Sequence, residues 1–108
     1  MAEETPNLKY LENLSAGNEV MMQRLWNVVK EEFPVEKKAY ENAMKQAAFK
    51  EAAELVHKIK NKIGILGLNT SYTTAKAYEE GLKIGDFTNQ KDFEQALLVL
   101  TDFIKKTE

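Results

Sequence analysis

The feature that most constrains this 108-residue chain is the spacing of its apolar residues, which recur every three or four positions on successive segments. The clearest stripe lies between Phe49 and Leu66, and its apolar residues follow at intervals of four, three, four and three: Ala52, Val56, Ile59, Ile63 and Leu66. Such a stripe runs along one side of an α-helix and is typical of helices that pack in bundles. Since no segment alternates apolar and polar residues with period two, we expect no β-sheet.

The same spacing predicts further helices, and residues that favour helix ends suggest where they begin and stop. These helices are expected at about Asn7–Leu14, Glu19–Phe33, Pro34–Gln46, Thr70–Ile84 and Asn89–Lys105. Gly17 suits a helix end, Asn18 suits an N-cap, and Pro34 suits a first helical position. We therefore expect an all-α fold, an antiparallel four-helix bundle with a short additional N-terminal helix, in a single domain over residues 1–108.

Composition narrows the classes of function. Hydrophobic residues make up 44% of the chain and charged residues 30%, a balance typical of globular domains. The absence of cysteine excludes a disulfide scaffold, a thiolate metal site and cysteine catalysis. A formal net charge of -2 predicts no general attraction to nucleic acid.

Hydropathy and the first residues suggest where the protein resides. No apolar run approaches the ~20 residues that a membrane span needs, and the acidic, polar segment Met1–Pro6 is unlike a secretory signal. We expect a soluble, cytoplasmic monomer. Trp26 and the neighbouring segment Val20-Met21-Met22 are interpreted as core rather than as a binding site.

The single histidine, His57, is the residue that suggests chemistry. At about 100° per residue it points away from the apolar stripe of its helix, so we expect His57 to be exposed while Ile59 and Ile63 are buried. Its neighbours within about 60° on the outward face are Ala53, Lys60, Asn61 and Gly64. Further lysines raise the positive charge nearby: Lys50, Lys58 and Lys62.

An exposed, neutral imidazole among lysines is suited to attack an activated phosphoryl group, because ammonium groups offset the charge on phosphate oxygens. Gly64 costs roughly 0.5–1 kcal/mol in a helix relative to alanine, which indicates either tight helix packing or the close approach of a partner. We favour the partner. The alternative for His57 is an ordinary surface histidine, with the lysines forming a solvated face.

The segment from Val56 to Leu68 resembles the signature of histidine-containing phosphotransfer (HPt) domains. Those domains carry a histidine, a lysine three residues later, then small residues and an apolar-Gly-apolar ending. His57 matches the phosphorylated histidine, Lys60 the lysine, Gly64 a commonly small position, and Leu66-Gly67-Leu68 the ending.

The resemblance extends beyond this segment and also has two departures. Leu11–Gly17 is similar to the opening Leu-x-x-Leu and turn of the family, and the histidine lies on the helix after the one that begins near Pro34. The family usually has glycine where this chain has Asn61, and serine or alanine where it has Lys62. The first departure affects the fit of a partner, and the second adds a charge beside the docking face.

The resemblance implies a phosphoryl carrier without kinase activity of its own. His57 would accept the group from a receiver-domain aspartyl phosphate, Lys60 would stabilise the phosphate charge, and Ala53, Asn61 and Gly64 would form the receiver docking face. Partners would be response-regulator receiver domains or a hybrid sensor histidine kinase, not nucleic acid or membrane. The magnesium ion would belong to the receiver.

The sequence agrees with a carrier that has no cofactor of its own. It contains neither the glycine-rich loops that bind nucleotides nor a set of histidines that could hold a metal. The main alternative is a helical interaction module of a signalling pathway that never carries phosphate. An autonomous enzyme ranks third, because His57 has no obvious acid partner in the sequence.

Overall fold

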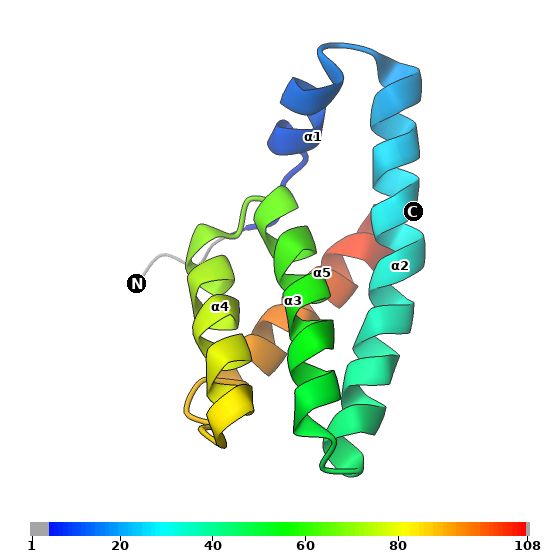
Figure 1. The fold of residues 1–108 in the computed structure, drawn as a ribbon. Helices are drawn as coiled ribbons and strands as arrows, with labels where there is room; N and C mark the ends of the chain where they lie inside the picture. The colour runs from blue at the N-terminus through cyan, green and yellow to red at the C-terminus, as the bar shows by residue number, and fades with distance from the viewer. Residues whose placement is uncertain (1–4, 108) are drawn as a thin grey trace.

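The computed structural model describes residues 5–107, and within that range it contains five α-helices and no strand. In chain order the helices are α1 (Lys9–Ser15), α2 (Glu19–Lys45), α3 (Phe49–Ile65), α4 (Asn69–Ile84) and α5 (Gln90–Lys106). Figure 1 shows α3 between α2 and α4, with α5 crossing behind α3. The all-helical class is confirmed. The expectation for Met1–Pro6 concerns a segment of which residues 1–4 lie outside the described part.

The predicted helix boundary at Pro34 is wrong, because α2 continues through this residue without a break. A proline inside a helix lacks the N–H donor and crowds the preceding turn, at a cost of about 3 kcal/mol. The apolar stripe nevertheless continues across it, since Val29 and Phe33 before Pro34 and Tyr40 and Ala43 after it are all buried. Burial on both sides of Pro34 therefore outweighs the local cost.

Replacing this proline tests that explanation. Pro34→Ala is expected to raise the free energy of unfolding by about 1–2 kcal/mol, since it restores a backbone donor while adding some freedom to the unfolded chain. Urea unfolding followed by circular dichroism measures the change. A less stable variant would contradict the view that α2 tolerates Pro34 at a cost.

The apolar stripe of α3 forms the centre of the core, as predicted. Ala52, Val56, Ile59, Ile63 and Leu66 all have no exposed surface. This helix packs against α2 on one side and α4 on the other, so its buried arc is wider than one stripe. Several residues that were expected on the outward face of α3 are therefore covered by a neighbouring helix.

An aromatic cluster joins α2, α4 and α5 near the core. The rings of Tyr40, Tyr78 and Phe93 lie with centroids 5.1–6.3 Å apart. The Tyr40 hydroxyl lies 2.7 Å from the Tyr78 hydroxyl and donates to Glu94 Oε2 at 2.7 Å. Burial, together with these hydrogen bonds, holds the pKa of Tyr40 far above its usual range, so Tyr40 stays a neutral donor to the carboxylate.

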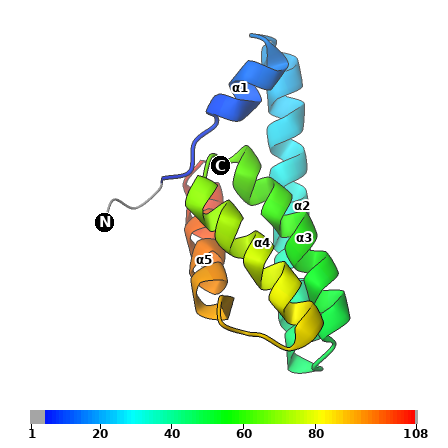
Figure 2. The same ribbon diagram turned by 60° about the vertical axis from the view of Figure 1, so that its left-hand side comes forward.

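The N-terminal end of α2 extends beyond α3 and is accompanied there by α1 (Figure 2). Asn18 caps it as predicted, its side chain accepting a hydrogen bond from the Met21 N–H at 3.0 Å. Trp26 is buried as predicted, but Val20 and Met21 are 68% and 46% exposed, so their assignment to the core is wrong. The reason is that little besides the short α1 is available to cover the first turns of α2. No helix within residues 5–107 is both long and apolar enough to cross a membrane.

Candidate functional site

His57 lies on α3, on the part of its surface that neither α2 nor α4 covers. Its side chain is 54% exposed, while Ile59 and Ile63 are fully buried, so the predicted orientation of the helix is confirmed. Lys60 lies on the same helix, and the remaining groups of the site come from α4, which runs beside α3 (Figure 1).

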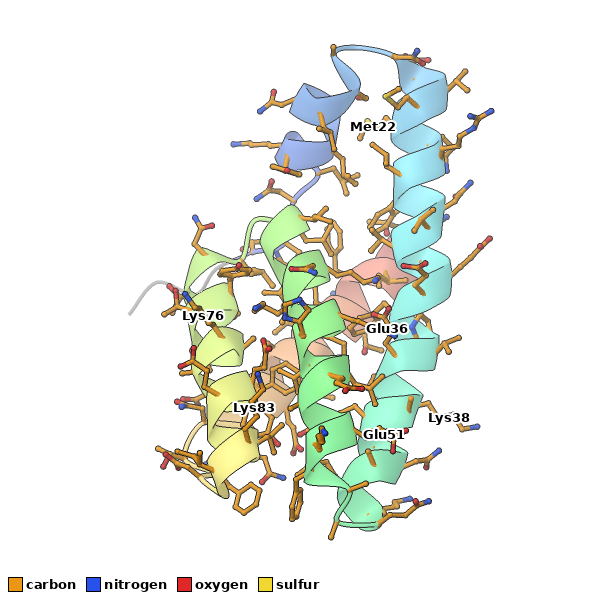
Figure 3. All side chains as sticks on the ribbon, viewed as in Figure 1. Met22, Glu36, Lys38, Glu51, Lys76 and Lys83 are labelled. Atoms are coloured by element: carbon orange, nitrogen blue, oxygen red, sulfur yellow. The ribbon has the colours of Figure 1, made fainter. Side chains whose placement is uncertain are left out.

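The acid partner that the sequence did not reveal is Glu79 of α4. His57 Nδ1 lies 3.2 Å from Glu79 Oε1 and 3.1 Å from Oε2. Lys60 Nζ donates to Glu79 Oε1 at 3.0 Å and lies 3.3 Å from His57 Nδ1. Lys83, labelled in Figure 3, adds a weaker ion pair with its Nζ 3.7 Å from Glu79 Oε2. We call His57, Lys60 and Glu79 the His–Lys–Glu cluster.

The ionisation state of Glu79 favours one tautomer of His57. Partial burial works to raise the pKa of Glu79, but hydrogen bonds from Lys60 and His57 outweigh it and hold that pKa below its usual value. An ionised carboxylate only accepts hydrogen bonds, so the two contacts to Glu79, at 3.1 and 3.2 Å, favour the tautomer with the proton on Nδ1, whereas the longer 3.3 Å contact from the Lys60 ammonium opposes it. The lone pair of the neutral ring then resides on Nε2, at the other edge of an exposed imidazole.

Lys60 is less accessible than expected for a residue of the outward face. It is only 8% exposed. Its ammonium group donates to Glu79 and also lies 5.8 Å from the ring centroid of Tyr72, and both of these residues belong to α4. The reason is that α4 covers this side of α3, so the lysine reaches the neighbouring helix rather than solvent. In this arrangement its charge is already paired.

Gly64 faces α4 rather than open solvent. A Cβ atom at this position would lie 3.0 Å from Cδ2 of Tyr72, closer than ordinary packing allows. Of the two explanations for a mid-helix glycine, the structure therefore favours tight helix packing over the approach of a partner. Ala53, also expected on the docking face, is 1% exposed, so its placement there is wrong. It falls within the wide buried arc that α2 and α4 together give α3.

The sequence suggested that Lys62 adds a positive charge beside His57, and this prediction is wrong. Lys62 points toward α2, where its Nζ lies 3.0 Å from Glu32 Oε1 and from both carboxylate oxygens of Glu36. Figure 3 shows Glu36 between α2 and α3. Lys62 is only 8% exposed, so its charge serves an ion pair between these helices.

Asn61 is exposed, as expected for a residue one turn from His57. It lies at the border of a groove of about 420 Å³ between α1, α2 and α3, whose apolar lining includes Leu25, Val28 and Ile65. The exposed Lys58 lies on the same border. The surface beside His57 is therefore shaped by Asn61 and Lys58, with Ala53 excluded from it and Gly64 covered in part by Tyr72.

Sequence reasoning missed Glu79 and Tyr72 because they lie 22 and 15 positions after His57, on another helix. One signal in the sequence could have drawn attention to Glu79. Ala75, Tyr78 and Leu82 mark the buried stripe of α4, and Glu79 sits directly beside it. A carboxylate beside a buried stripe that the neighbouring helix covers favours a partner on that helix.

Comparison of this chain with protein-family models, curated proteins and solved structures finds no match. Among residues 5–107 no group of three or more histidine and acidic side chains is placed to hold a metal ion. The His–Lys–Glu cluster is therefore the feature of the described residues that bears most directly on function.

Proposed function

We propose that this chain is a phosphoryl carrier of the HPt type, in which α2 to α5 form an antiparallel four-helix bundle. His57 accepts a phosphoryl group from the aspartyl phosphate of a receiver domain and passes it to another receiver. The carrier is a cytoplasmic monomer with no kinase activity or cofactor of its own, and the magnesium ion is supplied by the receiver. One observation carries this proposal: an exposed imidazole held through Nδ1 by an ionised carboxylate, which leaves Nε2 as nucleophile.

The chemistry at His57 needs no separate base. The Nε2 lone pair attacks phosphorus in line, the bond from phosphorus to the aspartyl oxygen breaks, and its electron pair stays with the departing carboxylate. The ring keeps its Nδ1 proton and so gains a positive charge, which the carboxylate of Glu79 offsets at hydrogen-bond distance. Attack by the aspartate of a second receiver reverses these steps.

Lys60 has a role that follows from its position within the cluster. Its ammonium group is held by Glu79 and lies 3.3 Å from His57 Nδ1, so it sits beside the ring that becomes phosphorylated. The flexible side chain of lysine lets its ammonium exchange one oxygen partner for another. We expect Lys60 to turn from Glu79 toward a phosphate oxygen when the phosphoryl group is on Nε2.

Lys60→Met tests this role while keeping much of the buried hydrocarbon length. Loss of a charge-assisted contact worth about 1–3 kcal/mol is expected to slow transfer or shorten the phosphohistidine lifetime by roughly 5- to 150-fold. The matched control is Lys58→Met, which removes an exposed lysine that is not among the groups paired with Glu79. Equal effects of the two substitutions on transfer rate and lifetime would mean that only general charge matters.

Asn61→Gly tests the departure from the family pattern at an exposed position beside His57. We expect Asn61 to exclude some receivers by its bulk, so the variant should accept phosphate faster from non-cognate receivers. It should also lose roughly 0.5–1 kcal/mol of stability, because glycine weakens a helix. A panel of phosphorylated receivers is assayed against both chains. Slower transfer from every receiver would instead indicate that the Asn61 amide hydrogen-bonds to the phosphoryl group.

The proposal as a whole is tested by incubating the chain with a receiver labelled as its aspartyl phosphate. A carrier takes up label in an acid-labile, alkali-stable form, as expected for phosphohistidine. Binding to receivers without any uptake of label would instead support the interaction module. Two-dimensional NMR of the labelled chain shows whether the phosphorus is on Nε2.

A further inference from the structure

A second surface of interest lies between α2 and α5 and includes no residue of α3 or α4. It consists of two adjoining depressions of about 770 and 400 Å³, which share Lys37 and Glu41. We call this surface the α2–α5 groove. His57 and Glu79 belong to other helices, so an occupant of the groove would leave the His–Lys–Glu cluster free.

The groove has an unusual concentration of positive charge. Six lysines line it, four from α2 and two from α5: Lys30, Lys37, Lys38, Lys45, Lys91 and Lys105. None of the six forms an ion pair within residues 5–107, whereas the buried lysines of α3 are all paired. The acidic residues of its lining are only Glu41 and Glu94. Since the whole chain has a net charge of -2, this excess is local.

Apolar surface lies between these lysines. Phe33, Leu97 and Ile104 are buried beneath the groove, while Leu98 is 58% exposed and Phe87 is 39% exposed within its lining. The Glu94 carboxylate accepts hydrogen bonds from Tyr40 at 2.7 Å and from Gln90 at 3.2 Å, and these neutral donors hold it in place while its negative charge remains. With six lysines and two glutamates, the lining carries a formal excess of four positive charges over an apolar strip.

The shape of the groove favours an elongated occupant. The part of α2 that lines it runs from Lys30 to Lys45, a length of about 22 Å at 1.5 Å per residue. Lysines border it on both sides, because they come from both helices. An amphipathic helix matches this geometry, since its apolar stripe would cover Leu98 and Phe87 while acidic residues on its flanks would meet the lysines.

We infer that the α2–α5 groove binds an acidic amphipathic helix of a partner protein. This inference does not depend on the proposed phosphotransfer function, because the groove shares no residue with the His–Lys–Glu cluster. Binding there would attach the carrier to a partner while His57 remains available to a receiver.

The probe for this inference is a fluorescein-labelled synthetic helix of about 15 residues, which matches the length of the groove. It carries leucine and phenylalanine at helical spacing and glutamate on both flanks. A second peptide keeps the apolar residues and replaces every glutamate by lysine. Fluorescence anisotropy with the full chain is expected to show saturable binding of the acidic peptide alone, weakened severalfold by added salt.

Charge reversal locates the site of binding. Lys37→Glu with Lys105→Glu is expected to weaken binding at least tenfold, because each change both removes an attraction and adds a repulsion. The control, Lys9→Glu with Lys76→Glu, makes the same change in net charge at exposed lysines outside the groove, and should bind as the parent does. Figure 3 shows Lys76 on α4, on the opposite side of the molecule from Lys38.

Three results would overturn the inference: no saturable binding, equal loss in the two charge-reversed chains, or NMR shift changes confined to residues outside the groove. Intact folding of each chain is checked by circular dichroism. His57→Gln should bind the peptide unchanged, so failure of the phosphotransfer proposal and failure of this one are separable.

Discussion

His57→Gln is expected to abolish phosphoryl uptake completely while leaving the fold intact. The reason for the first effect is chemical, because glutamine offers no ring nitrogen that could form the bond to phosphorus. The second follows from exposure, since more than half of the His57 side chain faces solvent. The glutamine amide can still donate to Glu79, so the change in unfolding free energy should stay within about 1 kcal/mol.

The measurement combines label transfer from a phosphorylated receiver with thermal unfolding of the same preparation. Glu80→Gln is the companion variant, because it alters an exposed residue outside both the cluster and the docking face and leaves the nucleophile in place. If the His57→Gln chain still takes up acid-labile label, another residue is the acceptor and the proposed function is wrong at its centre.

Glu79→Gln is expected to slow transfer by about 10- to 150-fold, equivalent to the loss of a charge-assisted contact of roughly 1.5–3 kcal/mol. Two physical effects act together. An amide can donate to Nδ1 as well as accept from it, so the ring is no longer held with its proton on Nδ1 and its lone pair on Nε2. The neutral amide also fails to offset the positive charge that the ring gains on phosphorylation. The comparison is Glu80→Gln, which neutralises the neighbouring, exposed carboxylate.

The same substitution has a second consequence for stability, with a defined dependence on pH. Glu79→Gln leaves Lys60 almost buried without its counter-charge, and should cost about 1–3 kcal/mol near neutral pH. Because the folded protein lowers the pKa of Glu79 below the usual 4.5, its stabilising effect is present above that pH and is lost as the pH falls through the folded value. The difference in unfolding free energy between parent and variant should therefore shrink below about pH 4.5.

Urea unfolding over a range of pH measures this difference. A gap that stays constant down to acidic pH would show that Glu79 acts through packing rather than charge. A Glu79→Gln chain that transfers as fast as Glu80→Gln would show that the carboxylate does not orient His57. These two outcomes separate the structural role of Glu79 from its positioning role in transfer.

The sequence alone determined the helical class and the inward face of α3. Ile59 and Ile63 were placed in the core and His57 outside it from spacing alone, because a helix turns by a constant angle per residue and one apolar stripe defines its orientation. The cap at Asn18 was also readable, since its donor, the Met21 N–H, lies three residues away along the same chain. These features depend on neighbours within one helix.

Only the tertiary structure decided the features that depend on a second helix. Whether α2 could continue through Pro34 depended on apolar burial on both sides of the proline, and local propensity pointed the other way. Lys60 and Lys62 differ by two positions, yet the first reaches Glu79 on α4 and the second Glu36 on α2. Glu79, the acid partner of His57, likewise depends on a contact between two helices. Its position is set by how α4 packs against α3, and no spacing within either segment encodes that contact.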